Sequence, residues 1–346
     1  MRMMSMDEQR SITFCPSITK GGIMRRACNS RLPPLSPAQQ ILRRVTLVSN
    51  NGPNQENAPV MSSGDVVRQF FASEVANLLR FDPVAREGEN PEGVHQLRVS
   101  SRRLRADLTV MSSVFHPREL DFLHTELGWL GKKLGQRRDL DIRVALLKHV
   151  RRDMPRWVAG QLLEGLQQLA YKEDEKIQRL LNADRYRHLM ATLAEAVVRP
   201  PLNQRAATPA TDVLGPGLCD ALSILVARVE TVGPTPTYDQ LHEIRILAKR
   251  VRYSAALSSP LFGLHAKSMA NSLEQVQTLL GELHDRVLVM EYFTRAFDGF
   301  EGEQSSLENA RAGIERRLTR EIKRLNSQWR QPYDEARRQG TFFCRS

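Results

Sequence analysis

The chain contains a segment that reads Val94-His95-Gln96-Leu97-Arg98-Val99-Ser100-Ser101-Arg102-Arg103-Leu104-Arg105. A second segment reads Leu241-His242-Glu243-Ile244-Arg245-Ile246-Leu247-Ala248-Lys249-Arg250-Val251-Arg252-Tyr253. Both contain the pattern H-x-x-R-x-x-x-[RK]-R-[LV]-R without a gap, and their histidines lie 147 positions apart (242 − 95). Because self-similarity at a fixed offset is typical of repeated structural units, the motif predicts a chain built from two similar halves.

A second pair of landmarks follows the two motifs at nearly the same offset. The two strings are Leu134-Gly135-Gln136-Arg137-Arg138-Asp139 and Leu280-Gly281-Glu282-Leu283-His284-Asp285, 146 positions apart (280 − 134). Since a glycine in the left-handed conformation commonly ends a helix, we expect helices to end at Gly135 and Gly281. Asp139 and Asp285 can then cap the helices that follow. The two landmarks together favour an internal duplication.

From residue 63 onward, apolar side chains recur with helical spacing and no strand pattern competes with them. We expect helices at about 65–80, 91–114, 118–134, 140–151, 155–181, 185–198, 212–232, 238–258, 265–280, 286–297 and 305–339. The fold class is therefore predicted to be all-α.

The domain organisation follows from composition. Residues 1–62 carry scattered Pro, Ser, Asn and Gly without a sustained period and are predicted to be disordered. The segments 63–200 and 212–346 are expected to form the two halves. A Pro-rich polar stretch over 201–211 is the expected linker between them.

Each motif, placed on a helix at about 100° per residue, separates into an apolar stripe and a basic face. The stripe of the first copy contains Leu97, Leu104 and Leu108. The basic face contains His95, Arg98, Arg102 and Arg105 in the first copy and His242, Arg245, Lys249 and Arg252 in the second. Arg103 and Arg250 fall outside this face, and Tyr253 borders it.

The basic face is unusual because no acidic residue lies on it. Like charges three or four residues apart destabilise a helix by about 0.2–0.5 kcal/mol per pair. Such a row is expected where an anion binds, since the arginine fork matches phosphate oxygens and lysine adds a compact charge. Ion pairs with acids on neighbouring helices are the alternative, and the agreement of the two copies favours a ligand. Each histidine could cap its helix, hydrogen-bond within the fold or, once protonated, donate to phosphate.

Further basic residues flank the second landmarks. They are Lys132, Lys133, Arg137 and Arg138 in the first half and His284 in the second. If a helix begins just after Arg138, its N-terminal N–H groups would also attract an anion. A solvated helix end is the alternative for this group.

Composition bounds the function further. The 50 Lys and Arg against 39 Asp and Glu give a net charge of +11, which favours anionic partners. The four cysteines, Cys15, Cys28, Cys219 and Cys344, lie far apart, so we expect neither a zinc site nor a disulfide, as in a reducing cytosol. No apolar run reaches the roughly eighteen residues of a membrane span, and no signal-peptide core begins the chain. A cytoplasmic protein without membrane contact is therefore expected.

The doubled motif and its landmarks resemble the conserved histidine α-helical domain, CHAD, over residues 63–340. The resemblance implies two antiparallel four-helix bundles related by pseudo-twofold symmetry, with a basic surface between them. It also implies binding of inorganic polyphosphate and localisation to polyphosphate granules. Some relatives carry a fused triphosphatase domain with an E-x-E-x-K strand. The closest string here, Glu173-Asp174-Glu175-Lys176, has a helical context, so the chain resembles the stand-alone form.

The resemblance carries the contact residues over position by position. It assigns His95, Arg98, Arg102, Arg105, His242, Arg245, Lys249 and Arg252 to the basic surface, and Arg103 and Arg250 also match the motif. With Tyr253 and the flanking Lys132, Lys133, Arg137, Arg138 and His284, these form the predicted polyphosphate-binding set. One departure is Arg138, which stands where the second half has His284.

The basic face favours a non-catalytic binder over two other classes. A phosphohydrolase would need carboxylates to hold Mg²⁺, and Asp139, Asp141 and Asp285 are the candidate acids beside the landmarks. Non-specific nucleic-acid binding shares the phosphate attraction and is the runner-up. The two histidines lack ligand partners at helical spacing, so we expect no metal site and no cofactor. The oligomeric state is left open by the sequence.

Overall fold

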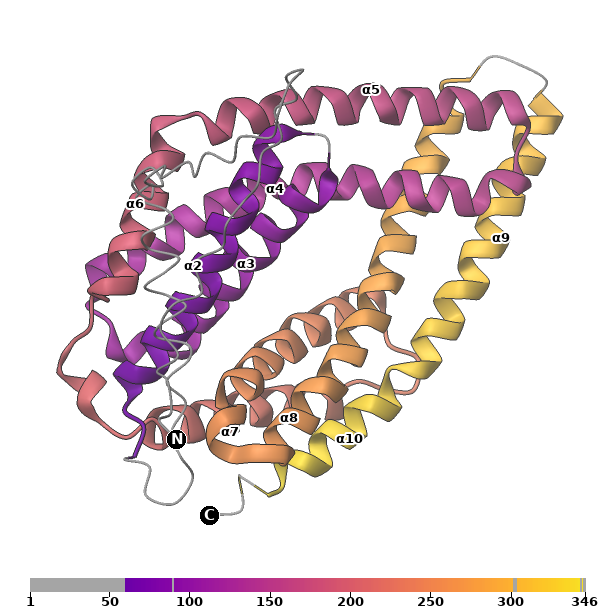
Figure 1. Cartoon of the computed structure of the whole chain (residues 1–346). Coiled ribbons are helices and arrows are strands. Elements are labelled where there is room, and N and C mark those ends of the chain that lie inside the picture. Colours follow the sequence, from indigo (N-terminus) through magenta and orange to yellow (C-terminus); the bar gives the residue numbers. More distant parts are fainter. Residues whose placement is uncertain (1–59, 89, 301–303, 343, 345–346) are drawn as a thin grey trace, which may run out of the picture. The chain divides into compact units, whose positions relative to one another are not determined.

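The computed structural model describes residues 60–88, 90–300, 304–342 and 344 (Figure 1). The helices are α2 (Ser63–Glu87), α3 (Pro91–Val110), α4 (Pro117–Val150), α5 (Arg156–Leu181), α6 (Asp184–Val198), α7 (Thr211–Glu230), α8 (Tyr238–Phe297), α9 (Gln304–Gln328) and α10 (Arg330–Gly340). Short 3₁₀ turns are η1 (Ser112–Val114), η2 (Arg151–Asp153) and η3 (Gln204–Ala207). In these ranges there are two isolated β-bridges and no strand. The all-α prediction is confirmed, while residues 1–59 of the predicted disordered segment lie outside the described residues.

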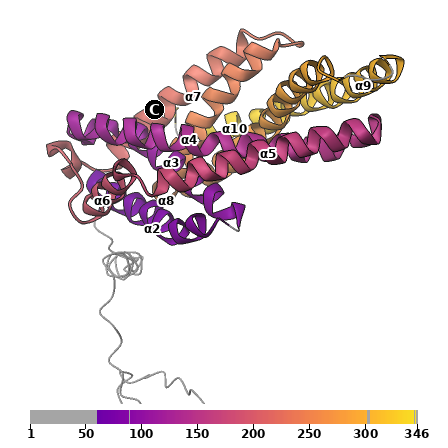
Figure 2. The same cartoon turned by 90° about the horizontal axis from the view of Figure 1, so that it is seen from above.

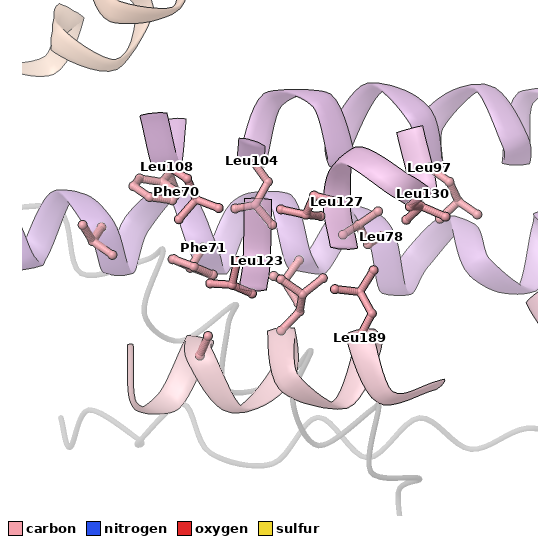
Figure 3. Close-up of a cluster of buried hydrophobic side chains, with 14 of the residues drawn as sticks. Phe70, Phe71, Leu78, Leu97, Leu104, Leu108, Leu123, Leu127, Leu130 and Leu189 are labelled. Atoms are coloured by element: carbon pink, nitrogen blue, oxygen red, sulfur yellow. The ribbon is translucent and has the colours of Figure 1, made fainter. Parts of the chain in front are cut away.

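The first motif lies in α3, which is held by an apolar core. Leu97, Leu104 and Leu108 are fully buried, as the helical period predicts. They meet Phe70, Phe71 and Leu78 of α2, Leu123, Leu127 and Leu130 of α4 and Leu189 of α6 (Figure 3). Burial of one such side chain contributes about 1.5–3 kcal/mol, so the core fixes which face of α3 points inward. The basic residues are thereby directed away from it.

Helix α4 continues through Gly135, and α8 continues through Gly281, so the predicted helix ends at these glycines are wrong. A Cβ added at Gly135 would lie 3.7 Å from Nε of Arg98, and one added at Gly281 would lie 3.7 Å from Nε of Arg245. The two glycines therefore each lie beside an arginine, at a distance where a Cβ would make ordinary van der Waals contact. Because the helices do not stop, the caps expected at Asp139 and Asp285 are wrong as well.

The break predicted between residues 258 and 265 is a kink within α8. Gly263 has φ +66° and ψ −142°, and only glycine adopts such a conformation without strain. The second motif lies before this kink and the second landmark after it. The kink turns the chain back, so that one long element carries both parts of the second half.

Residues 201–211, predicted as a linker, are hydrogen-bonded to the first half. The side-chain Nδ2 of Asn203 donates to the carbonyl oxygens of Ser113 (3.0 Å) and Phe115 (2.9 Å). The backbone N–H of Ala210 donates to the carbonyl of Met61 (2.9 Å). The side chain of Ser62 caps α2, so residues 61–62 lie inside the ordered part although the sequence placed them in the disordered segment.

The two predicted halves share a hydrophobic core at the ends of their long helices. The C-terminal part of α4 lies beside α5, and α9 lies beside the C-terminal part of α8 (Figures 1 and 2). We call these ends the distal cluster, whose buried residues are Leu140, Leu147, Val150, Met154, Val158, Leu162, Leu166, Val289, Phe293, Phe297, Leu307, Ala310, Ile314 and Leu318. Both halves contribute to it, and the arrangement as two four-helix bundles stays a prediction. The duplication and its pseudo-twofold relation stay predictions.

The prediction that the cysteines form no disulfide is wrong. Cys219 of α7 and Cys344, beyond α10, are joined by a disulfide with their Cα atoms 5.6 Å apart. They are 125 positions apart in the chain, so only the tertiary fold brings their Cβ atoms within bonding geometry. The link ties the C-terminal end of the described chain to α7. Within the described ranges, no helix is long and apolar enough to span a lipid bilayer.

Candidate functional site

Helices α3, α4 and α8 line a cavity of about 500 Å³. Its lining residues are Arg98, Arg102, Arg105, Ala106, Thr109, Val110, Leu127, Gly128, Gly131, Lys132, Ile246, Lys249, Arg250 and Tyr253. We call it the cationic cavity, because four arginines and two lysines line it and none of these described residues is acidic. Both copies of the motif contribute, so the structure brings together residues that are about 150 positions apart.

The cations of the cavity lack ion-pair partners. Arg98, Arg102, Arg105, Lys132, Lys249 and Arg250 form no salt bridge with any acid in the part of the chain that the structure describes. Nε of Arg102 is buried and has no hydrogen-bond partner among the described residues. A buried donor without an acceptor is unfavourable by about 1–3 kcal/mol. An anion in the cavity would remove this penalty.

Lys249 is the point at which the two copies of the motif meet electrostatically. Burial, followed by the charges of Arg102, Arg245, Arg98 and Arg105, lowers the pKa of Lys249 to about 8. Arg98, Arg102 and Arg105 belong to the basic face of the first motif copy, and Arg245 belongs to that of the second copy. The pKa of Arg98 is lowered for the same reasons, burial first and then Arg102. A bound anion would oppose both effects.

Gly128, Gly131 and Gly135 lie on one face of α4, next to side chains of α3. A Cβ added at Gly128 would lie 3.5 Å from the guanidinium carbon of Arg105, and Gly135 has the same relation to Arg98. Gly131 faces the hydroxyl of Ser101 at 3.9 Å. Glycine within a helix is unfavourable by about 1 kcal/mol relative to alanine. Gly128 and Gly131 line the cavity, and the sequence motifs singled out neither of them.

His95 stands three residues before Arg98 on α3 and does not line the cationic cavity. Burial and then the charge of Arg138 lower the pKa of His95. The Arg138 charge also acts on Arg98, which places Arg138 beside the cavity although it does not line it. Nδ1 of His95 and Nδ1 of His242 are both buried without a hydrogen-bond partner among the described residues. The two copies therefore present their histidines in the same way.

The second half contains a ring cluster that the sequence reading found only in part. Tyr238, His242 and His284 lie together, with ring centroids 5.1 Å apart for the two histidines and 5.7 Å apart for Tyr238 and His284. The Tyr238 hydroxyl and Nδ1 of His284 are hydrogen-bonded. Burial, and then Arg245 and His242, lower the pKa of His284 to about 4, so it is neutral at neutral pH. Tyr238 was not predicted, although it stands four residues before His242 on the same helix.

Three predicted site residues are engaged in ion pairs instead. Arg137 is paired with Asp141 and with Asp174, the latter at 2.6 Å. Arg103 lies 3.8 Å from the buried Glu74. Arg137 is therefore bound by acids of α4 and α5, whereas the alternative stated for its group was a solvated helix end.

Arg252 is the third paired residue. Its guanidinium contacts Oε1 of Glu274 at 3.2 Å and donates to Oε1 of Gln277 at 2.6 Å. Its ring neighbour Tyr253 lines the cavity but is only 6% exposed, with the Arg252 guanidinium carbon 5.2 Å from the ring centroid. Arg250 lines the cavity although the helical wheel placed it off the basic face. Lys133 does not line the cavity.

The expectation of an anion site at a helix N-terminus beside Arg138 is wrong, because α4 is continuous there. Residues 60–88, 90–300, 304–342 and 344 contain no cluster of three or more His, Cys, Asp or Glu side chains that could hold a metal ion. The chemistry that the arrangement offers is therefore electrostatic: a cavity with fixed positive charges, partly buried and open to an anion.

Curated relatives occur in Mycobacterium tuberculosis. The uncharacterized proteins MT2285 (strain CDC 1551 / Oshkosh) and Rv2226 (strain ATCC 25618 / H37Rv) are each 28% identical to this chain over 269 residues. The match covers 72% of this chain and 49% of each relative. The chain therefore spans about half the length of the curated relatives it matches.

Two solved structures share the fold. PptA from Streptomyces chartreusis superposes with a TM-score of 0.64 at 18% identity, over 79% of this chain and 99% of that one. The CHAD domain from the plant Ricinus communis superposes with a TM-score of 0.62 at 21% identity, over 82% and 96%. The family model of the CHAD domain matches residues 69–294, a span that includes both motifs and both landmarks. The chain thus belongs to the CHAD domain family.

Proposed function

We propose that this protein binds inorganic polyphosphate in the cationic cavity and performs no chemistry on it. The observation that carries the proposal is the convergence of unpaired cations from both motif copies on one cavity without an acid in its lining. Polyphosphate carries negative charge along its whole length, and guanidinium groups bind phosphate oxygens in a bidentate way. Membership of the CHAD family supports the same ligand, because the doubled motif carries the cavity's main cations.

The lining of the cavity supports binding rather than hydrolysis. A metal-dependent phosphohydrolase would need carboxylates beside the phosphate to hold Mg²⁺. Asp139, whose charge acts on Arg98, and Asp285, on which Arg245 acts, are two acids close to the basic rows. Neither lines the cavity. Burial raises the pKa of Asp285.

Nucleic acid is the competing ligand, because its backbone offers the same charge. Recognition of base edges needs polar side chains aimed into a groove, and recognition of single strands needs exposed aromatic rings. Tyr253 is the aromatic residue of the lining, and it is almost fully buried. Phosphate contacts alone would then not favour nucleic acid over a simpler and denser polyanion.

Calorimetric titration of the purified protein with long-chain polyphosphate and with duplex DNA, matched in phosphate concentration, tests the proposal. At about 150 mM salt, where surface attraction is screened beyond roughly 8 Å, we expect polyphosphate to bind much more tightly. Equal affinity for the two would contradict a specific polyphosphate site. Absence of heat and of co-sedimentation with polyphosphate would contradict the proposal as a whole. Release of orthophosphate during incubation with Mg²⁺ would contradict the non-catalytic part. Recruitment to polyphosphate granules in cells would follow from the binding and can be followed with a fluorescent fusion.

A further inference from the structure

The last arginines of the two motifs occupy equivalent positions but have different surroundings. Arg105 and Arg252 are 147 positions apart (252 − 105), the same offset as the histidines. Arg105 lines the cavity and has no ion-pair partner in the described chain. Arg252 is held by Glu274 at 3.2 Å and by Gln277 at 2.6 Å. The two motif copies therefore differ in charge pairing: the last arginine is unpaired in the first copy and paired with an acid in the second.

The residues that hold Arg252 stand where the first half has glycines. Gly128 and Gly131 of α4, advanced by the landmark offset of 146, correspond to Glu274 and Gln277 of α8. The correspondence is also geometric. A Cβ added at Gly128 would lie 3.5 Å from the guanidinium carbon of Arg105, and the Glu274 carboxylate lies beside the guanidinium of Arg252 in the same way.

A carboxylate and a phosphate present similar oxygens to a guanidinium group. In the second half the chain itself supplies such an anion, the carboxylate of Glu274. Oε1 of Gln277 accepts a hydrogen bond from Arg252, whereas its buried Nε2 has no hydrogen-bond partner among the described residues. In the first half the same space is open, because two glycines leave it free. The Arg252 side chain is only 16% exposed, whereas Arg105 is exposed to the cavity.

We propose that Glu274, with Gln277, replaces the ligand phosphate in the second half and confines polyphosphate contacts to the side of the cavity formed by α3 and α4. Glu274 is then a specificity-determining residue, because it decides how many phosphate units the two motifs engage. This inference rests on the proposed polyphosphate binding of the cavity. It predicts that the two motifs, alike in sequence, bind unequally.

The reciprocal exchange of the two environments tests the inference. Glu274→Gln removes the competing charge and keeps the side-chain shape, so polyphosphate affinity is expected to rise about threefold to fivefold, the range of an exposed ion pair. The slope of log K against log salt should steepen by about one, since one more phosphate contact forms. Glu274 is 59% exposed, so the variant is expected to fold normally, as thermal unfolding would verify.

The opposite exchange is Gly128→Glu, which places an acid beside Arg105. A Cβ fits there at ordinary contact distance, so the variant is expected to fold and to bind polyphosphate about tenfold more weakly, because the new acid pairs with Arg105 and repels phosphate. Gly128→Gln is the matched control for side-chain bulk and should lose much less.

Two outcomes would overturn the inference while the proposed function stands. One is unchanged affinity and salt slope in Glu274→Gln, and the other is equal affinity of Gly128→Glu and Gly128→Gln. If the unaltered protein binds no polyphosphate, the proposed function and this inference both fail, and the Gly128 variants are then irrelevant to distinguishing them.

Discussion

Arginines lie between helices both in the cationic cavity and beside the distal cluster, yet the two groups have opposite surroundings. Beside the distal cluster, Arg286 contacts Glu321 at 2.7 Å and Arg317 contacts Asp153 at 2.8 Å. His149 contacts the same Glu321 at 2.8 Å. In the cavity the arginines face one another and find no acid among the described residues. The Arg317–Asp153 and His149–Glu321 contacts join the two halves, whereas the arginines of the cavity have no acidic partner in the described chain.

The difference has an energetic meaning. A half-buried ion pair with good hydrogen bonds offsets the desolvation of its charges, and removal of one partner leaves the other charge exposed to that penalty. A row of like charges without partners destabilises the fold until a ligand neutralises it. Substitutions in the two regions should therefore separate stability from binding.

The largest expected effect comes from removing the cations at the centre of the two basic rows. Replacement of Arg98, Arg102, Arg245 and Lys249 by Ala together should weaken polyphosphate binding by more than about 100-fold, because four charges that neutralise phosphate are lost. Helical content and the free energy of unfolding should not fall, since mutual repulsion is relieved. Titration and thermal unfolding by circular dichroism measure the two quantities. Loss of the fold would show that the rows are structural after all.

A substitution beside the distal cluster is expected to lower stability and to leave binding unchanged. Glu321→Gln removes the acid shared by Arg286, His149 and Arg317, and should lower the free energy of unfolding by about 2 kcal/mol, the size of hydrogen bonds to charged groups. Polyphosphate affinity should not change. Urea unfolding gives the stability, and weakened binding in a folded variant would contradict the separation of the two regions.

Low pH should also lower the free energy of unfolding, through protonation of Glu321. Burial acts to raise the pKa of Glu321, but hydrogen bonds from His149 and Arg286 outweigh it, and the net effect lowers the pKa below 4.5. Its folded-state pKa is thus below its unfolded value. The stability that it contributes is present above about pH 4.5 and is lost as the pH falls through the folded-state pKa.

A smaller effect is expected from pH on binding. The pKa of Lys249 in the free protein is about 8, and a bound polyanion raises it. Binding is therefore at full strength below about pH 8 and weakens as the pH rises above 8, by at most tenfold per pH unit for one proton. Lys249→Arg, which stays charged, should flatten the affinity profile between pH 7 and pH 9.5. An equally steep profile in that variant would assign the titration to another group.

The smallest expected effects separate two adjacent arginines. Arg138→Ala should weaken polyphosphate binding about threefold and reduce the salt slope by about one, since one phosphate contact is lost. Arg137→Ala should leave binding unchanged and lower the free energy of unfolding by about 1 kcal/mol, because Arg137 is paired with Asp141 and Asp174. Equal loss of binding in both variants would remove the distinction between paired and unpaired cations.

Much of the fold could be predicted because helical periodicity is local. The buried stripe of α3, with Leu97, Leu104 and Leu108, follows from the spacing of apolar residues alone. Helix ends were less predictable. Gly135 and Gly281 look like terminators in sequence, but tertiary contacts with Arg98 and Arg245 give them another role. The disulfide between Cys219 and Cys344 had no spacing signal.

By itself the sequence determined that this protein is helical, which residues share the basic face of each motif and that the motif occurs twice. These properties depend on neighbours within two helical turns. Only the tertiary structure decided which of the basic residues remain free, because Glu74, Asp174 and Glu274, which contact Arg103, Arg137 and Arg252, lie on other helices or beyond the kink of α8. Ion pairing between helices depends on how they pack, which no local pattern records. The cavity exists where that packing left the cations of two motifs together without an acid.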